Sequence, residues 1–252
     1  MINDKSQKYP SVKEVTDSQR INMVKEIFSS ITGRYDFLNH FLSLRRDVAW
    51  RRFAVKKMRF FQTCLFLDVA TGTSDLAIEV ALYYPEIRAV GLDFVDEMMD
   101  LGKKKVERKG LSKRIRMLKG DALHIPSPSN QFDVAGIAFG IRNIPDKSRV
   151  LHEMMRVVVP GGQVMVLEMT SPQTRFFNSI YRIYLKKILP VLARAFSPKP
   201  NAYHYLADSI IDFPTPGDFA SLMKRSGLVD VEMHSLTLGI THLHIGYKPR
   251  TG

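Results

Sequence analysis

Residues 65–84 read LFLDVATGTSDLAIEVALYY, and this stretch decides the fold class. The run 65–70 is short and mostly apolar, as expected for a buried strand, and it ends in a turn of Thr, Gly and Ser residues. From Asp75 to Tyr84 apolar residues recur at helical spacing, so we expect a helix there. A strand, a glycine-containing turn and a helix in this order are typical of the first unit of a parallel α/β sheet.

Strands and helices continue to alternate beyond this unit. Further strands are expected at 88–92, 115–119, 132–139 and 163–169, with helices at 98–109 and 148–158. Helical patterns are also expected over 12–61 and 173–213, and a last helix and two strands at 216–226, 229–234 and 241–248. The pattern predicts an α/β, Rossmann-like fold: a doubly wound, seven-stranded sheet with helices on both faces.

The composition excludes several classes of protein. With 252 residues, 45% of them hydrophobic, the chain can bury a sizeable core and is not a disordered or low-complexity polymer. No apolar run approaches the roughly 20 residues of a spanning helix, and the polar start predicts no secretory signal. The single cysteine, Cys64, fits a reducing compartment. The net charge of +12 favours an anionic partner, such as a nucleic acid, a membrane surface or an acidic metabolite, without choosing among them.

Acidic residues lie near the ends of three of the expected strands, at the sheet edge where α/β proteins bind ligands. Asp68 precedes the first turn, Asp93 ends the second strand and Asp121 follows the third. Gly72 lets a ligand approach the backbone closely, and the helix start after it offers N–H groups to an anion such as a carboxylate. Asp93 is placed to bind a ribose diol.

A dinucleotide site and a purely structural turn are the alternative interpretations of this segment. A pyrophosphate site prefers G-x-G-x-x-G, whereas this turn has one glycine and is flanked by aspartates that repel phosphate. A ligand with hydroxyls, an amino group and a sulfonium, but no phosphate, suits the acidic residues better. We therefore favour S-adenosylmethionine over a nicotinamide cofactor.

Several stretches resemble the C-methyltransferases of menaquinone and ubiquinone biosynthesis, the UbiE/MenG type of class I methyltransferase. They are residues 35–39 with 50–51, 67–76 with 91–94, 120–122 with 137–143, 156–168, 202–214 and 236–248. The resemblance covers nearly the whole chain and is most specific at 35–50 and in FGIRN at 139–143. Ser74 stands where the family usually has glycine, and its side chain could crowd the methionine end of the cofactor.

The resemblance implies a set of cofactor-binding residues. It places Thr73, Asp93, Asp121 and Ala122 at the cofactor, and we add Asp68, Ala70 and Gly72 because the same turn must carry the methionine portion. Tyr35 and Asn39 are expected to fold over the cofactor as part of a lid, the alternative being a core tyrosine and a helix cap. No histidine pair with carboxylates at ligand spacing suggests a metal.

The implied reaction is C-methylation of a prenylated quinol. Demethylmenaquinol is the first choice of substrate, and 2-polyprenyl-6-methoxy-1,4-benzoquinol of ubiquinone biosynthesis is the alternative. The protein must position the reduced ring and stabilise a phenolate or accept its proton. Arg142 is a candidate for stabilising the phenolate or orienting a water, and Asn143 for fixing the ring oxygen. Alternatively, Arg142 pairs with a nearby carboxylate such as Asp146.

Two further side chains and one basic segment are candidates for the substrate side. Tyr203 and His204 could act as acid or base from the helical insertion. Residues 175–196 place apolar side chains on one helical face and basic ones on the other. This segment could lie on an anionic membrane surface, which would suit a prenyl tail, or its apolar face could cover the core.

We expect one methyltransferase domain over residues 1–252. Its parts are a helical arm (1–62), a cofactor-binding core (63–172), a helical lid insertion (173–214) and a C-terminal helix with the last two strands (215–250). A cytoplasmic location is expected, with peripheral attachment to the inner face of the cell membrane left open, as is a homodimer. A nucleic-acid methyltransferase and a non-catalytic S-adenosylmethionine-binding protein are the rival functions. We expect no nucleic-acid partner, because FGIRN replaces the Asn/Asp-Pro-Pro-aromatic motif of base methylation.

Overall fold

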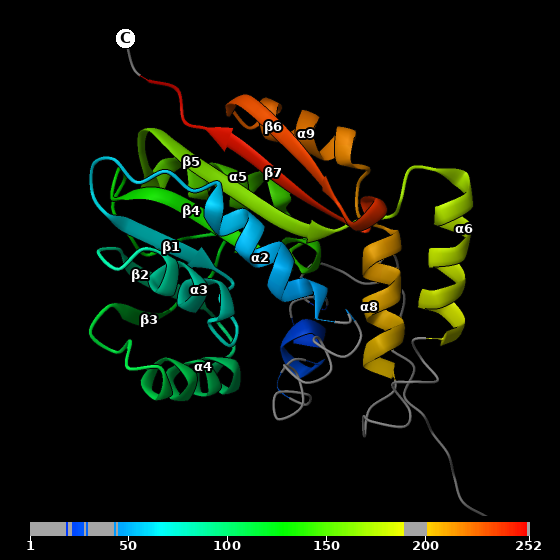
Figure 1. Ribbon diagram of the computed structural model, residues 1–252, viewed down its shortest axis with the longest axis horizontal. Helices are drawn as coiled ribbons and strands as arrows, with labels where there is room; N and C mark the ends of the chain where they lie inside the picture. Colours follow the sequence, from blue (N-terminus) through cyan, green and yellow to red (C-terminus); the bar gives the residue numbers. More distant parts are fainter. Residues whose placement is uncertain are drawn as a thin grey trace, which may run out of the picture.

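The computed structural model describes residues 19, 22–27, 29, 43, 45–188 and 201–250, and for residues 201–204 it describes the backbone alone. Seven strands form one sheet in the order β3-β2-β1-β4-β5-β7-β6 (Figure 1). Neighbouring strands from β3 to β5 are parallel, and β7 is antiparallel to both β5 and β6. The strands are β1 (Leu65–Val69), β2 (Arg88–Asp93), β3 (Ile115–Lys119), β4 (Phe132–Ala138), β5 (Val158–Met169), β6 (Val229–Leu236) and β7 (Thr241–Tyr247). The seven-stranded α/β prediction is confirmed.

Most helices begin and end close to the expected residues. Those of the described chain that carry a label are α2 (Arg46–Lys56), α3 (Asp75–Tyr83), α4 (Asp96–Arg108), α5 (Lys147–Val157), α6 (Arg175–Ile183), α8 (Asn201–Ile211) and α9 (Pro216–Arg225). Local chemistry explains two of the starts. The Asp146 side chain accepts from the N–H of Arg149 and caps α5, while the Thr215 hydroxyl accepts from Asp218 N–H and caps α9.

Buried polar side chains end α2 earlier than the sequence predicts. The expectation of helix up to residue 61 is wrong after Lys56. Gln163 of β5 accepts from the N–H of Arg59 at 2.6 Å and donates to the carbonyl of Lys57 at 3.1 Å. Asp133 then accepts from the N–H groups of residues 62–64 at 2.8–3.0 Å. These long-range bonds replace helical ones and lead the chain into β1.

Two apolar layers cover the sheet, one on each face. Successive residues of β1 point to opposite sides, so that Phe66 packs with α2 and α3 while Leu67 packs with α5 and α9. Strand β5 begins at Val158 rather than at Gln163, because the Pro-Gly-Gly segment stays within the strand as an irregularity of its pairing with β4. Trp50 donates to the hydroxyl of Thr237 at 2.8 Å and ties α2 to the segment before β7.

A third apolar cluster lies beyond the ends of the parallel strands. It joins residues 23–27 to α6 and α8, which Figure 1 shows beside this end of the sheet. Tyr181 and Tyr205 are buried in it. In contrast, Phe176, Ile180 and Ile183 of α6 are 68%, 51% and 53% exposed. The alternative in which this apolar face covers the core is therefore wrong for these three residues.

Candidate active site

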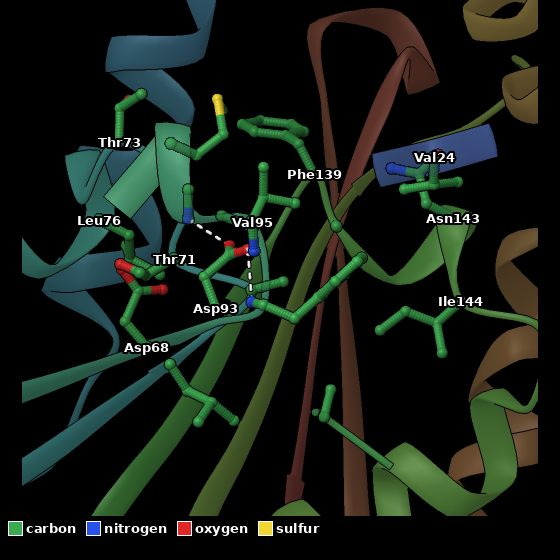
Figure 2. Close-up of a pocket in the computed structure, with 18 of the residues that line it drawn as sticks. Val24, Asp68, Thr71, Thr73, Leu76, Asp93, Val95, Phe139, Asn143 and Ile144 are labelled. Carbon is green, nitrogen blue, oxygen red and sulfur yellow. Dashed lines mark hydrogen bonds between the residues drawn. The ribbon is translucent and has the colours of Figure 1, made fainter. Parts of the chain in front are cut away.

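A cavity opens where the parallel strands end, beside the turn between β1 and α3. Its walls come from this turn, from the ends of β2 and β4, and from segment 120–123 after β3. In Figure 2 Asp68, Thr71 and Thr73 lie on one side of Asp93, and Asn143 and Ile144 lie on the other. Eight residues named from the sequence line this cavity: Asp68, Ala70, Gly72, Thr73, Asp93, Asp121, Ala122 and Asn143.

The turn between β1 and α3 has a backbone that favours small residues. Ala70, Gly72 and Ser74 have positive φ angles of 50°, 54° and 65°. Glycine adopts this conformation without the steric cost that a Cβ atom adds. The N–H of Thr71 donates to the carbonyl of Leu92 at 2.9 Å. The turn is therefore fastened to β2, which keeps the cavity wall in place.

Asp93, the last residue of β2, is a buried carboxylate held by backbone amides. Its Oδ2 accepts from Gly72 N–H at 2.7 Å, and its Oδ1 accepts from Phe94 and Val95 at 2.8 and 3.0 Å. Dashed lines at Asp93 mark such bonds in Figure 2. Burial raises the pKa of Asp93, while these hydrogen bonds oppose the rise. The carboxylate is thus fixed in the cavity wall, where ligand hydroxyls can donate to it.

Asp68 lies buried in the wall formed by the same turn. Its Oδ2 accepts from the Thr71 hydroxyl at 2.6 Å and from Ala77 N–H at 3.1 Å. Burial raises the pKa of Asp68 to about 7, although the Arg51 guanidinium acts to lower it. Because Ala77 lies in the first turn of α3, Asp68 already occupies part of the helix start that the sequence offers to an anion.

Asp121 and Ala122 follow β3 at the rim of the cavity. Ala122 is buried, whereas Asp121 is exposed and accepts from Leu123 N–H at 2.9 Å. The Asp121 carboxylate therefore faces both the cavity and the solvent. It can receive a hydrogen bond from a polar group of a ligand without the burial that affects Asp68 and Asp93.

Ser74 points away from the cavity, contrary to the expectation that it crowds the ligand. Its hydroxyl lies 3.1 Å from the sulfur of Met117, and the residue is fully buried. A Cβ atom at Gly102 of α4 would lie 2.6 Å from the Ser74 oxygen. Because Gly102 has no side chain, the Ser74 hydroxyl packs against α4. Ser74 is therefore not among the residues that line the cavity.

Arg51 of α2 also lines the cavity, and sequence reasoning missed it. Its Nη1 donates to Asp47 at 2.7 Å, and its Nη2 lies 3.5 Å from Asp75. The guanidinium stands over the Phe139 ring, 5.4 Å from the centroid. The resemblance marked position 51, but only the packing of α2 against α3 shows that this side chain reaches the cavity.

The 3-10 helix Ile141–Asn143 after β4 holds two of the proposed catalytic residues. Asn143 lines the cavity, and its Oδ1 accepts from the Tyr205 hydroxyl of α8 at 3.2 Å. Arg142 is buried, and it is not among the described residues that line the cavity. Its Nη1 donates to Glu168 of β5 at 2.5 Å. The alternative from the sequence, in which Arg142 pairs with a carboxylate, is therefore confirmed, but the partner is Glu168 and not Asp146.

Four further candidate residues come from the helical arm and from α8. Tyr35 and Asn39 lie outside the described residues, and so do the side chains of Tyr203 and His204, whose backbone belongs to α8. Their proposed roles stay predictions.

His244 of β7 is buried and makes a hydrogen bond within the fold, not in the cavity. The Nε2 atom of His244 lies 3.0 Å from the carbonyl of Pro216, and burial lowers the pKa of this histidine to about 4. Across the described ranges, no group of three or more His, Cys, Asp or Glu side chains is arranged to hold a metal ion.

The charges of the cavity fit a ligand that carries hydroxyls and both signs of charge. Its described lining includes four aspartates and, as its one basic side chain, Arg51. The aspartates are Asp68, Asp75, Asp93 and Asp121. Carboxylates accept from hydroxyl and ammonium groups but repel phosphate. This donor and acceptor set fits S-adenosylmethionine, which has a diol, an ammonium, a sulfonium and a single carboxylate.

Comparison with known proteins places these features in a family. A model of the ubiE/COQ5 methyltransferase family matches residues 13–248. The chain is 44% identical over 226 residues to the ubiquinone/menaquinone biosynthesis C-methyltransferase UbiE of Geotalea daltonii, covering 89% of this chain and 96% of that protein. It is 41% identical to the demethylmenaquinone methyltransferase of Deinococcus radiodurans, covering 89% of this chain and 92% of that protein.

Solved structures share the fold at low sequence identity. A methyltransferase of Thermotoga maritima, described as S-adenosylmethionine-dependent and a possible histamine N-methyltransferase, superposes with a TM-score of 0.61 at 19% identity, covering 88% of this chain and 98% of that chain. Phosphoethanolamine N-methyltransferase 2 of Haemonchus contortus, solved with S-adenosylmethionine, gives a TM-score of 0.60 at 14% identity, covering 85% of this chain and 56% of that chain. At these identities the likeness concerns the fold.

Proposed function

We propose that this chain, which belongs to the ubiE/COQ5 methyltransferase family, methylates a ring carbon of a prenylated quinol. The chain is an S-adenosylmethionine-dependent C-methyltransferase. The observation that carries the quinol proposal is the lining of the cavity. It joins the aspartates at the ends of β1 and β2 to Asn143 of the family-specific FGIRN segment.

The residues of the first two strand ends are proposed to hold the cofactor. S-adenosylmethionine, when bound, supplies an electrophilic methyl group on a sulfonium. Asp93 would accept from the ribose hydroxyls, and Asp121 with Ala122 would bind the adenine end. Asp68, Ala70, Gly72 and Thr73 would hold the methionine portion against the turn. Tyr35 and Asn39 of the helical arm are proposed to close over it.

Asn143 is proposed to position the substrate ring. It lines the cavity, and its carbonyl oxygen already accepts from Tyr205. Its amide N–H groups can therefore donate to a ring oxygen of the quinol, which holds the reacting carbon in place.

Arg142 is proposed to stabilise the phenolate through its charge. Its guanidinium is held by Glu168, so the charge has a fixed position next to Asn143 in the chain. Arginine stays protonated and does not act as a simple base. For the phenolic proton, Tyr203 and His204 of α8 stay the proposed acid and base.

Demethylmenaquinol is the proposed substrate, and 2-polyprenyl-6-methoxy-1,4-benzoquinol is the second candidate. Relatives named for ubiquinone and menaquinone together and relatives named for demethylmenaquinone alone support the two choices. The test offers labelled S-adenosylmethionine with each quinol in reduced and oxidised form, and with tRNA and DNA. Transfer to a reduced quinol, and not to its quinone, is expected. Cofactor binding without any transfer, or label in nucleic acid, would contradict the proposal.

Helix α6 is proposed to contact the membrane that holds the prenyl tail. Its exposed apolar residues Phe176, Ile180 and Ile183 adjoin the basic residues Arg175 and Arg182. A basic amphipathic helix of this kind binds anionic lipid surfaces. Within the described part of the chain, no helix has the length and apolar character needed to cross a bilayer.

A further inference from the structure

We infer that Arg51 binds the carboxylate of the cofactor's methionine portion. The inference rests on the use of S-adenosylmethionine stated above and assigns a residue to a ligand group that no aspartate can serve. That carboxylate is the one full anionic group of the ligand, and it must enter a cavity whose wall carries Asp68, Asp75, Asp93 and Asp121. Without a cation in the same wall, the carboxylate would be repelled.

Arg51 is the basic side chain placed to supply that cation. Among the described residues of the cavity wall it is the single Lys, Arg or His. It is 8% exposed, so its charge acts in a partly dry site where electrostatic attraction is stronger than in water. A guanidinium has five N–H donors and can bind Asp47 while it also binds a ligand carboxylate.

The surroundings of Arg51 hold the guanidinium in position for a carboxylate. Asp47 fixes one end of the fork at 2.7 Å, and the ring of Phe139 supports its face at 5.4 Å. The distance of 3.5 Å to Asp75 exceeds the roughly 2.7–2.9 Å of a charge-assisted hydrogen bond. Asp75 also pairs with Lys105, so its charge does not have to be balanced by Arg51 alone.

The start of α3 is the other place where a carboxylate could bind, and it is partly occupied. Asp68 accepts from the N–H of Ala77 in the first turn of this helix. An incoming carboxylate would meet the Asp68 side chain there. Arg51 reaches the same cavity from α2 and lies beside the start of α3, with its Nη2 3.5 Å from Asp75.

Decarboxylated S-adenosylmethionine separates this role from a structural one. The experiment measures the affinity of wild type, Arg51→Gln and Arg51→Lys for S-adenosylmethionine and for the decarboxylated analogue by calorimetry. Arg52→Gln is the matched control, because Arg52 is the next residue of α2 and forms an exposed pair with Glu79. We expect wild type to prefer the intact cofactor by roughly 10- to 100-fold.

The two variants should lose this preference by different amounts. In Arg51→Gln the intact cofactor should bind about as weakly as the analogue, whose own affinity should stay near wild type. Arg51→Lys, which retains a charge and is the variant to use if Arg51→Gln does not fold, should keep part of the preference. Equal weakening of both ligands, or an unchanged preference, would overturn the inference. Failure of wild type to bind either ligand would instead contradict the function itself.

Discussion

Ser74 and Gly102 form a matched pair at the base of the cofactor turn. Ser74 holds a left-handed backbone, which costs a non-glycine residue about 1–2 kcal/mol, and its side chain fills the space above Gly102. We expect Gly102→Ala to lower the free energy of unfolding by about 1–3 kcal/mol, since the new Cβ would lie 2.6 Å from the serine oxygen. Urea unfolding measures this effect.

The same measurement on a double variant tests the pairing. Ser74→Gly removes the clashing oxygen, so Ser74→Gly/Gly102→Ala should regain most of the loss. Gly217→Ala is the control, because nothing lies within 4 Å of a Cβ built there. If Gly102→Ala lowers the free energy of unfolding as much in the Ser74→Gly protein as in wild type, the two residues do not interact.

Asp68 should give the protein an unusual dependence of stability on pH. Its pKa is about 7 in the folded chain and near 3.8 in the unfolded one, so the folded state binds the proton more tightly between these values. Its contribution to the free energy of unfolding should therefore fall by about 1.4 kcal/mol per pH unit as pH rises from about 4 to 7. His244 opposes this, because its pKa is lowered to about 4 and its neutral form stabilises the fold above that pH.

Asp68→Asn removes the contribution of Asp68 to the pH dependence of the free energy of unfolding and leaves that of His244. The variant should lose stability on acidification from pH 6.5 to pH 4.5 more steeply than wild type, because the Asp68 contribution that opposes that of His244 is then absent. Urea unfolding across this range measures the slopes, and Asp100→Asn, at an exposed position, is the control. Parallel curves for wild type and Asp68→Asn would mean that the folded protein does not hold Asp68 protonated.

At the scale of residues, the sequence predicted the aspartates of the cavity but not its basic side chain, Arg51. Asp68, Asp93 and Asp121 were visible because each lies at or just beyond the end of a strand, and parallel strands end at one sheet edge. Arg51 lies on a helix before the sheet, so its distance to the cavity depends on how α2 packs. Glu168 as the partner of Arg142 was hidden for the same reason, since the two residues meet only through the pairing of β4 with β5.

Helix α8 is expected to orient Asn143 through Tyr205. Tyr205→Phe removes the hydroxyl that donates to Asn143 and leaves the ring in its buried cluster. We expect a three- to tenfold lower kcat/KM for the quinol with unchanged cofactor affinity, in line with the roughly 1 kcal/mol of such a bond. Steady-state kinetics and calorimetry measure the two quantities. Tyr83→Phe, on the exposed side of α3, should behave as wild type, and an equal loss of cofactor affinity in Tyr205→Phe would contradict this role.

The exposed apolar face of α6 is predicted to bind anionic membranes. Phe176→Glu/Ile180→Glu replaces two exposed apolar side chains with acids, so binding to anionic vesicles should fall at least tenfold through lost burial and added repulsion. Flotation with vesicles containing phosphatidylserine measures this. Leu82→Glu removes an equally exposed apolar residue from α3 and should bind as wild type. Similar binding of all three proteins, or no binding of wild type at low salt, would sink the proposal.

Element boundaries were predictable where local chemistry sets them. Asp146 and Thr215 are helix caps that act on residues three positions away, and α5 and α9 begin near the expected residues. The end of α2 and the start of β5 depend instead on Gln163 and on pairing with β4, which join distant parts of the chain. Local patterns do not contain this information.

At the scale of the whole molecule, the doubly wound, seven-stranded α/β sheet was predictable from the alternation of strands and helices. The third apolar cluster was not, because it joins residues 23–27 to α6 and α8 across more than half of the chain. This cluster stands at the end of the sheet where the cavity opens, and Val24 lines that cavity. The described residues 23–27 of the arm therefore pack with α6 and α8 of the insertion beside the cavity, while a lid role for both and the division of the chain at residues 62, 172 and 214 stay predictions.

The most direct test of the account is the position of the transferred methyl group. Purified protein would be given 13C-methyl S-adenosylmethionine and reduced demethylmenaquinone, and the lipid product would be examined by NMR. We predict a single labelled methyl on a ring carbon, formed only under reducing conditions. A methyl on the quinol oxygen, or label in added RNA and none in the lipid, would contradict C-methylation of a quinol by this protein.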